Sequence, residues 1–130
     1  MFAEGNLLKI RFEAQGGEFD VGAPPPEVNK WVHVAVTYDN GVGKIYVDGK
    51  LAGEGKGAGP LNKSNEPFFI AADCERQNYS FNGLIDEFAM HLRVLSEKEI
   101  GEHLAKGGGV LAVEAVGKLA TRWGAVKSGY

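Results

Sequence analysis

Polar side chains of several kinds are concentrated between residues 73 and 80, in the stretch DCERQNYS. Planar amides and carboxylates can hydrogen-bond sugar hydroxyls, and an aromatic ring can stack on the apolar face of a sugar. The residues suited to this chemistry are Asp73, Arg76, Asn78 and Tyr79. The alternative is an ordinary solvated turn, because loops are generally polar.

A carboxylate interrupts an apolar pattern in residues 82–93, NGLIDEFAMHLR. Side chains two residues apart in a strand share a face, so the pattern predicts a buried face containing Asp86. A buried carboxylate must be paired, protonated or metal-bound. Asp86 is therefore either a calcium ligand or an acceptor of backbone N–H groups that pins a turn. A bulge at Asn82-Gly83 would reverse the face. The apolar members of the face are Leu84, Phe88, Met90 and Leu92.

Motifs for catalysis are missing from the sequence. Glycoside hydrolysis needs two carboxylates that flank one bond, whereas Asp86 and Glu87 are adjacent and would point to opposite sides of a strand. Neither G-x-S-x-G nor H-E-x-x-H occurs. We therefore expect a protein that binds without chemistry. The histidines at 33, 91 and 103 are scattered along the sequence, which favours structural roles over a zinc site.

The composition is that of one globular domain. The chain has 130 residues, 44% of them apolar, and a net charge of −3. This balance argues against nucleic acid as a partner, and no apolar stretch is long enough to span a bilayer. The 19 glycines indicate frequent turns and favour an all-β fold. The single cysteine, Cys74, cannot form an internal disulfide.

Alternating apolar residues predict strands in most of the first two-thirds of the chain. Asn40-Gly41 and Asp48-Gly49 are hairpin turn signals, so residues 31–54 are predicted to be a three-stranded antiparallel meander. Its first strand, residues 30–39, should be central or line a groove, with Trp31 more often core than sugar platform. Residues 53–60, GEGKGAGP, are predicted to be a flexible loop. Further strands are expected near residues 8–12, 18–21, 67–72 and 81–93.

One short helix is predicted after these strands. Ser96 and Glu99 have the spacing of a capping box, Leu95 and Ile100 that of a hydrophobic staple, and Gly107 is a suitable stop. The tail, residues 108–130, could hold a strand or an amphipathic helix, or be loosely docked.

Four segments in order resemble the laminin-G-like, or concanavalin A-like, lectin family. They are WVHVAVTYD at 31–39, IYVDG at 45–49, FNGLIDEF at 81–88 and LSEKEI at 95–100. The resemblance implies an all-β, antiparallel jelly-roll β-sandwich over residues 1–107. It also implies an extracellular or cell-surface location and binding to a polysaccharide or glycoprotein. Some members of the family bind calcium, with an aspartate at the position of Asp86 among the ligands.

The sequence departs from this family at its amino-terminal side. Only about 30 residues precede Trp31, where the family has several strands. The domain is therefore expected to be shortened, and its open sheet edge invites pairing with another strand. Three alternatives follow: self-association into an oligomer, completion by a second chain, or a rearranged monomer closed by the tail. A structural or adhesion module that binds protein through this edge is the alternative to a lectin.

Overall fold

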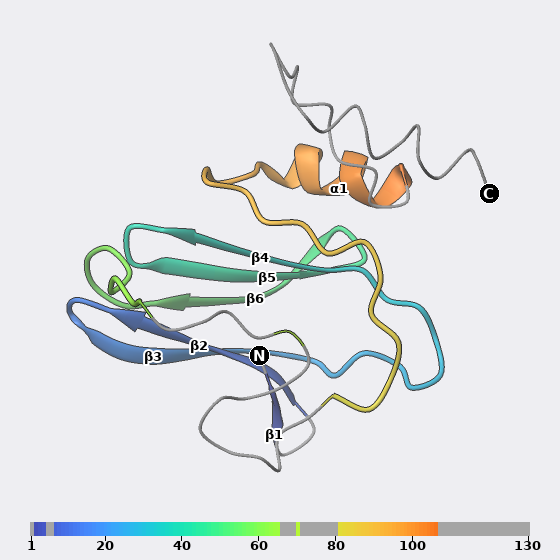
Figure 1. Ribbon diagram of the computed structural model, residues 1–130, viewed down its shortest axis with the longest axis horizontal. Coiled ribbons are helices and arrows are strands. Elements are labelled where there is room, and N and C mark those ends of the chain that lie inside the picture. Colours follow the sequence, from blue (N-terminus) through green and yellow to red (C-terminus); the bar gives the residue numbers. More distant parts are fainter. Residues whose placement is uncertain (1, 5–6, 66–69, 71–80, 107–130) are drawn as a thin grey trace.

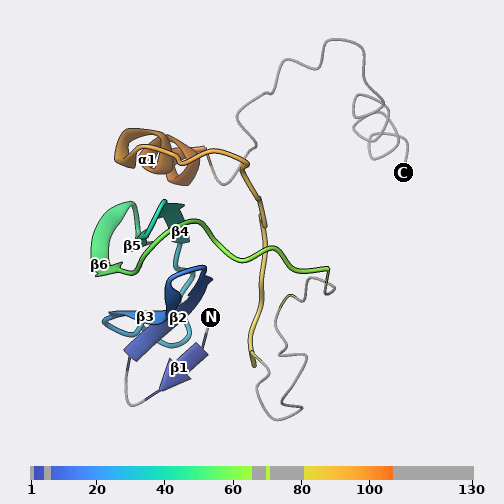
Figure 2. The same cartoon turned by 90° about the vertical axis from the view of Figure 1, so that its left-hand side faces the viewer.

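Two small antiparallel sheets and one helix make up the part of the chain that the computed structural model describes, residues 2–4, 7–65, 70 and 81–106 (Figure 1). The two sheets lie face to face, and the helix lies on the outer side of the second sheet (Figure 2). This confirms the predicted all-β sandwich with one short helix. The first sheet contains β1 (Phe2–Glu4), β2 (Leu7–Ala14) and β3 (Gly17–Ala23), the second contains β4 (Val34–Asp39), β5 (Val42–Val47) and β6 (Lys50–Lys56), and the helix is α1 (Glu97–Ala105).

The core lies between the sheets and follows from strict alternation along β2, where every second residue is buried. Ile45 on β5 is at the centre, with 0% of its surface exposed. Such burial is worth roughly 2 kcal/mol for one aliphatic side chain. The members of this buried cluster are Leu8, Ile10, Phe12, Val21, Ala23 and Ile45.

Three aromatic rings join the two sheets at one end of the core. Phe12 and Phe19 stack with centroids 5.3 Å apart, and Tyr38 on β4 lies 5.1 Å from Phe12. The Tyr38 hydroxyl donates a hydrogen bond of 2.6 Å to the Gly59 carbonyl, so its polar end is satisfied. These contacts attach the edge strand β4 to the first sheet.

The predicted meander is confirmed, with tight turns where the sequence placed them. Asn40, Gly41, Asp48 and Gly49 all have positive φ, as two-residue turns of the I′ kind require. The predicted position of the first strand was wrong, because β4 begins at residue 34 and is an edge strand among the strands that the structure describes. The central strand of the second sheet is β5.

The glycine-rich stretch after the meander was predicted to be a loop, but its first part belongs to strand β6. Gly53, Gly55 and Gly57 alternate, and each faces β3 across the sandwich. A Cβ at Gly53 would clash with the Gly22 carbonyl oxygen, and one at Gly57 with the Phe19 ring. The glycines therefore allow the backbones of β6 and β3 to approach closely.

The amino-terminal segment is less reduced than the sequence predicted. Although only about 30 residues precede Trp31, residues 2–23 supply a complete three-stranded sheet. Register pairing between β2 and β3 runs from Leu8 opposite Ala23 to Ala14 opposite Gly17. The chain thus contains both layers of a sandwich.

Residues 81–94 contradict the strand predicted there. They run past the sheets on the β4 side without joining either one (Figures 1 and 2), and Glu87 has φ 55°, which breaks an extended path. Leu84, Met90 and Leu92 are 78%, 63% and 104% exposed, so the predicted buried face is not buried. The strand predicted at 67–72 lies outside the described residues, apart from Ile70.

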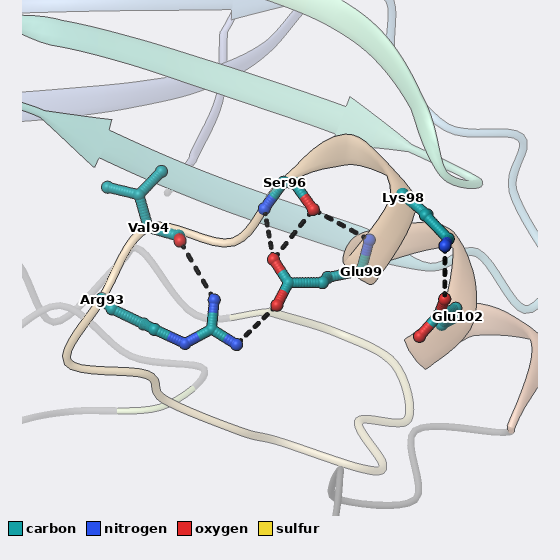
Figure 3. A network of polar contacts seen from close by, with 6 residues as sticks. All are labelled: Arg93, Val94, Ser96, Lys98, Glu99 and Glu102. Atoms are coloured by element: carbon teal, nitrogen blue, oxygen red, sulfur yellow. Dashed lines mark hydrogen bonds and ion pairs between the residues drawn. The ribbon is translucent and has the colours of Figure 1, made fainter.

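Helix α1 confirms the sequence prediction closely (Figure 3). The Ser96 hydroxyl accepts from the Glu99 N–H at 3.3 Å, and the Ser96 N–H donates to the Glu99 carboxylate at 2.8 Å. Ile100 is buried, and the Leu104 side chain lies near Gly49 in the β5–β6 turn. The predicted tail, residues 108–130, and Gly107 lie outside the described residues.

Candidate functional site

The predicted ligand-binding loop falls in a part of the chain that the structure does not describe. Asp73, Arg76, Asn78 and Tyr79 all lie there, so their role remains a prediction. Asp86 is described, and it is exposed. Its carboxylate accepts a 2.8 Å hydrogen bond from the adjacent Glu87 N–H, a local turn contact rather than a core one.

The fit of Asp86 to calcium can be judged from its surroundings. Calcium takes six to eight oxygens, usually from several carboxylates and carbonyls. Among the described residues, no three histidine, cysteine or acidic side chains lie close enough together to hold a metal. The described part of the chain thus offers no cluster of carboxylates around Asp86, and we derive no role for calcium from it.

A hollow of about 230 Å³ lies on the outer face of the first sheet, lined by Arg11, Glu18, Phe19 and Asp20. Alternation in β2 places Arg11 on this outer face, directly opposite Asp20. The guanidinium donates two hydrogen bonds to the Asp20 carboxylate, of 2.9 and 3.1 Å. Glu18 lies 4.0 Å from the same guanidinium.

This hollow has two carboxylates, and one of them, Asp20, is held as an ion by Arg11 and cannot serve as the catalytic acid. A catalytic acid in such enzymes needs a raised pKa. Hydrogen bonds from Arg11 instead lower the pKa of Asp20 below its ordinary value of 3.8. Two N–H groups of Arg11 already donate to Asp20, so fewer N–H groups remain to bind a ligand. The hollow is therefore better explained as a cross-strand ion pair than as a catalytic or sugar site.

Trp31 gives a stronger candidate surface. It was predicted to be core, but it is 69% exposed in the segment that connects the two sheets. Glu27 and Lys30 form an ion pair beside it, and Asn29 has φ 62°, which bends the backbone just before the ring. An exposed indole next to amide and charged groups has the chemistry required for sugar stacking.

His91 and His103 form a pair that the sequence did not predict. They are twelve positions apart, and their rings meet edge to face with centroids separated by 5.0 Å. His103 is buried, whereas His91 is partly exposed. No local motif could have revealed the pair, because one residue precedes α1 and the other lies in its last turn.

The comparisons with known proteins identify the family to which this chain belongs. A family model for the concanavalin A-like lectin/glucanases superfamily matches residues 1–101. The chain belongs to this superfamily. The match covers both sheets and the first turn of α1, and the resemblance inferred from the four sequence segments is confirmed.

The superfamily includes lectins, which are binding proteins, and glucanases, as its name states. No curated protein matches the chain. Among solved structures, an S-layer domain-containing protein from Clostridium thermocellum is similar, with 24% identity and a TM-score of 0.46. The alignment covers 68% of this chain and 46% of that one, so the present chain spans less than half of its length. Within the described residues, no helix has the length and apolar character to cross a membrane.

Proposed function

We propose that this chain is a non-catalytic carbohydrate-binding module that recognises a polysaccharide or glycoprotein outside the cell. The observation that carries the proposal is membership in the concanavalin A-like lectin/glucanases superfamily over residues 1–101.

Trp31 is the residue that we propose as the sugar platform. Its exposed ring offers an apolar face, and the neighbouring Asn29, Glu27 and Lys30 offer groups that bond hydroxyls. Aromatic side chains that become buried against a ligand dominate binding energies, with losses of about 2 kcal/mol or more on truncation. The loop residues Asp73, Arg76, Asn78 and Tyr79 are proposed as the polar contacts of the same module.

A glycan array with the purified chain tests this proposal. We expect binding to a defined glycan class and at least a tenfold loss of affinity with Trp31→Ala. Val28→Ala is the matched control, since Val28 is exposed three residues earlier but has no ring. Asp20→Asn should leave binding unchanged. Absence of binding to any glycan, or full binding by Trp31→Ala, would contradict the proposal or its site.

Calcium is tested in the same experiment by adding either calcium or a chelator. If Asp86 is a calcium ligand, binding should be lost with chelator and with Asp86→Asn. If Asp86 only caps its local turn, neither change should affect affinity. Turnover of β-glucan by the pure chain, abolished by Asp86→Asn or Glu87→Gln, would instead indicate a hydrolase.

A second candidate function is favoured by the open edge at β4. The Asp48 N–H donates to the His33 carbonyl at 2.9 Å, so these two residues form a hydrogen-bonded pair. Along an antiparallel pair of strands, hydrogen-bonded and non-hydrogen-bonded residue pairs alternate. Val34, Val36 and Tyr38 therefore turn their backbone groups away from β5, and no described strand pairs with them. The nearby residues 81–94 also lie outside every described strand and expose apolar side chains.

An added strand could bond to β4 and cover these apolar side chains, as in proteins that bind by β-augmentation. The strand would come from a second copy or from a complementing chain. Light scattering after size exclusion should then show concentration-dependent association that Val36→Lys abolishes, because an edge lysine blocks pairing. Leu51→Lys on the opposite edge strand, β6, is the control. A monomer at all concentrations would argue against self-completion.

A further inference from the structure

The pair His91–His103 belongs neither to the Trp31 surface nor to the backbone edge of β4. His91 comes from the extended segment before α1, and His103 from the last turn of α1. His103 is only 6% exposed, and its Nε2 atom is buried without a hydrogen-bond partner among the described residues. His91 lies against it with ring planes at 75°.

A buried nitrogen without a partner has a physical cost. Leaving such a group unsatisfied costs about 1–3 kcal/mol, so buried polar atoms in native proteins are nearly always bonded. A neutral imidazole has one nitrogen with a free lone pair. That lone pair can accept a proton donor or bind a metal ion.

The separation of the two rings matches a shared metal ion. Zinc binds histidine nitrogens at about 2.0–2.1 Å in tetrahedral geometry, and an imidazole nitrogen lies about 1.1 Å from its ring centre, so two ligands of one ion have centroids about 5 Å apart. The observed separation is 5.0 Å. Two imidazoles in such positions favour zinc, nickel or copper over calcium or magnesium, which prefer oxygen ligands.

We propose that His91 and His103 bind one divalent transition-metal ion, with Nε2 of His103 as one ligand. Since no third histidine, cysteine or acidic side chain joins the pair among the described residues, water would fill positions that those residues leave open. Two protein ligands make a weaker site than the four of a structural zinc centre. The bound ion would connect residues 81–94 to α1 and thereby stabilise the folded chain.

The experiment uses the full chain without an affinity tag. Thermal unfolding and calorimetric titration are measured with Zn²⁺, and separately with Ca²⁺. We expect Zn²⁺, but not Ca²⁺, to raise the melting temperature, and His91→Ala to lower Zn²⁺ affinity at least tenfold.

Two control variants separate this site from other zinc ligands. His33→Gln removes the remaining histidine, and Cys74→Ser removes the only thiol. Both should keep the Zn²⁺-induced stabilisation. His91 is chosen over His103 for the main variant because it is partly exposed and its loss should not unfold the chain. No response of the unmodified chain to Zn²⁺, an unchanged response in His91→Ala, or loss of the response in Cys74→Ser would overturn the proposal.

Discussion

Strand β2 and the segment 84–92 have similar sequence patterns and different structures. Both alternate apolar residues with others, yet every second residue of β2 is buried, whereas the alternate residues of 84–92 are exposed. The difference lies in their partners. β2 has hydrogen-bonded neighbours on both sides and a facing sheet, while segment 84–92 belongs to neither of the described sheets.

The comparison shows what alternation can and cannot predict. A period of two identifies which side chains share a face, but burial requires a partner strand and a covering layer from elsewhere in the chain. Helix α1 follows directly after the exposed segment and still forms as predicted. Its signals, Ser96 and Glu99, act within one turn and need no distant partner.

The largest expected effect comes from the core itself. Ile45→Ala removes a side chain with no exposed surface and should lower the free energy of unfolding by about 2–5 kcal/mol. Leu92→Ala, in the exposed segment, should change it by less than about 0.5 kcal/mol. Urea unfolding of both variants measures the difference. An equal loss for Leu92→Ala would mean that segment 84–92 is packed in solution.

Two glycines give the next contrast. Gly53→Ala places a methyl group against the Gly22 carbonyl oxygen and should cost about 1–3 kcal/mol, because two backbones would have to separate. At Gly101 in α1, nothing lies within 4 Å of an added methyl. Gly101→Ala should therefore stabilise the chain by up to about 1 kcal/mol through helix propensity. Opposite shifts in melting temperature are the expected result. A neutral Gly53→Ala would show that the sheets do not approach as closely as described.

The helix cap should have a smaller, pH-dependent effect. Ser96→Ala should cost about 1 kcal/mol. Hydrogen bonds from Arg93 and Ser96 lower the pKa of Glu99 from 4.5 to about 2. A lowered carboxylate pKa stabilises the fold above pH 4.5, and this contribution is lost as the pH falls toward 2.

Far-UV circular dichroism in an acid titration can follow this loss of helix. Glu99→Gln removes the titrating group but keeps a side chain that can cap, so it should flatten the acid limb of the curve. Lys98→Gln, one residue earlier and on an exposed side chain, is the control. An unchanged acid limb in Glu99→Gln would assign the titration to other carboxylates.

The sequence predicted those parts of the structure whose signals are local. Both hairpin turns of the meander, the alternation in β2 and the capping box follow from neighbouring residues. It did not predict Gly53 and Gly55 as close contacts with β3, because their partners lie about 30 positions away. The alternation of these glycines with charged residues in GEGKG was the available signal.

The candidate site was less predictable for the same reason. Trp31 was expected to be buried as part of a strand, but it lies in the connection between the two sheets and is exposed. The pairing of His91 with His103 depends on the direction in which α1 packs over the second sheet. The Asp86 prediction assumed a paired strand, and without one its carboxylate bonds only to the next residue.

Hydrogen exchange measured by mass spectrometry on the intact chain tests the central contrast most directly. Amides in β2 and β5 are bonded within paired sheets, whereas those of residues 84–92 are not part of any described strand. The account predicts slow exchange in β2 and β5 and rapid exchange in residues 84–92 of the unliganded monomer. Protection of residues 84–92 equal to that of β5 would show that this segment is already paired and would contradict the account.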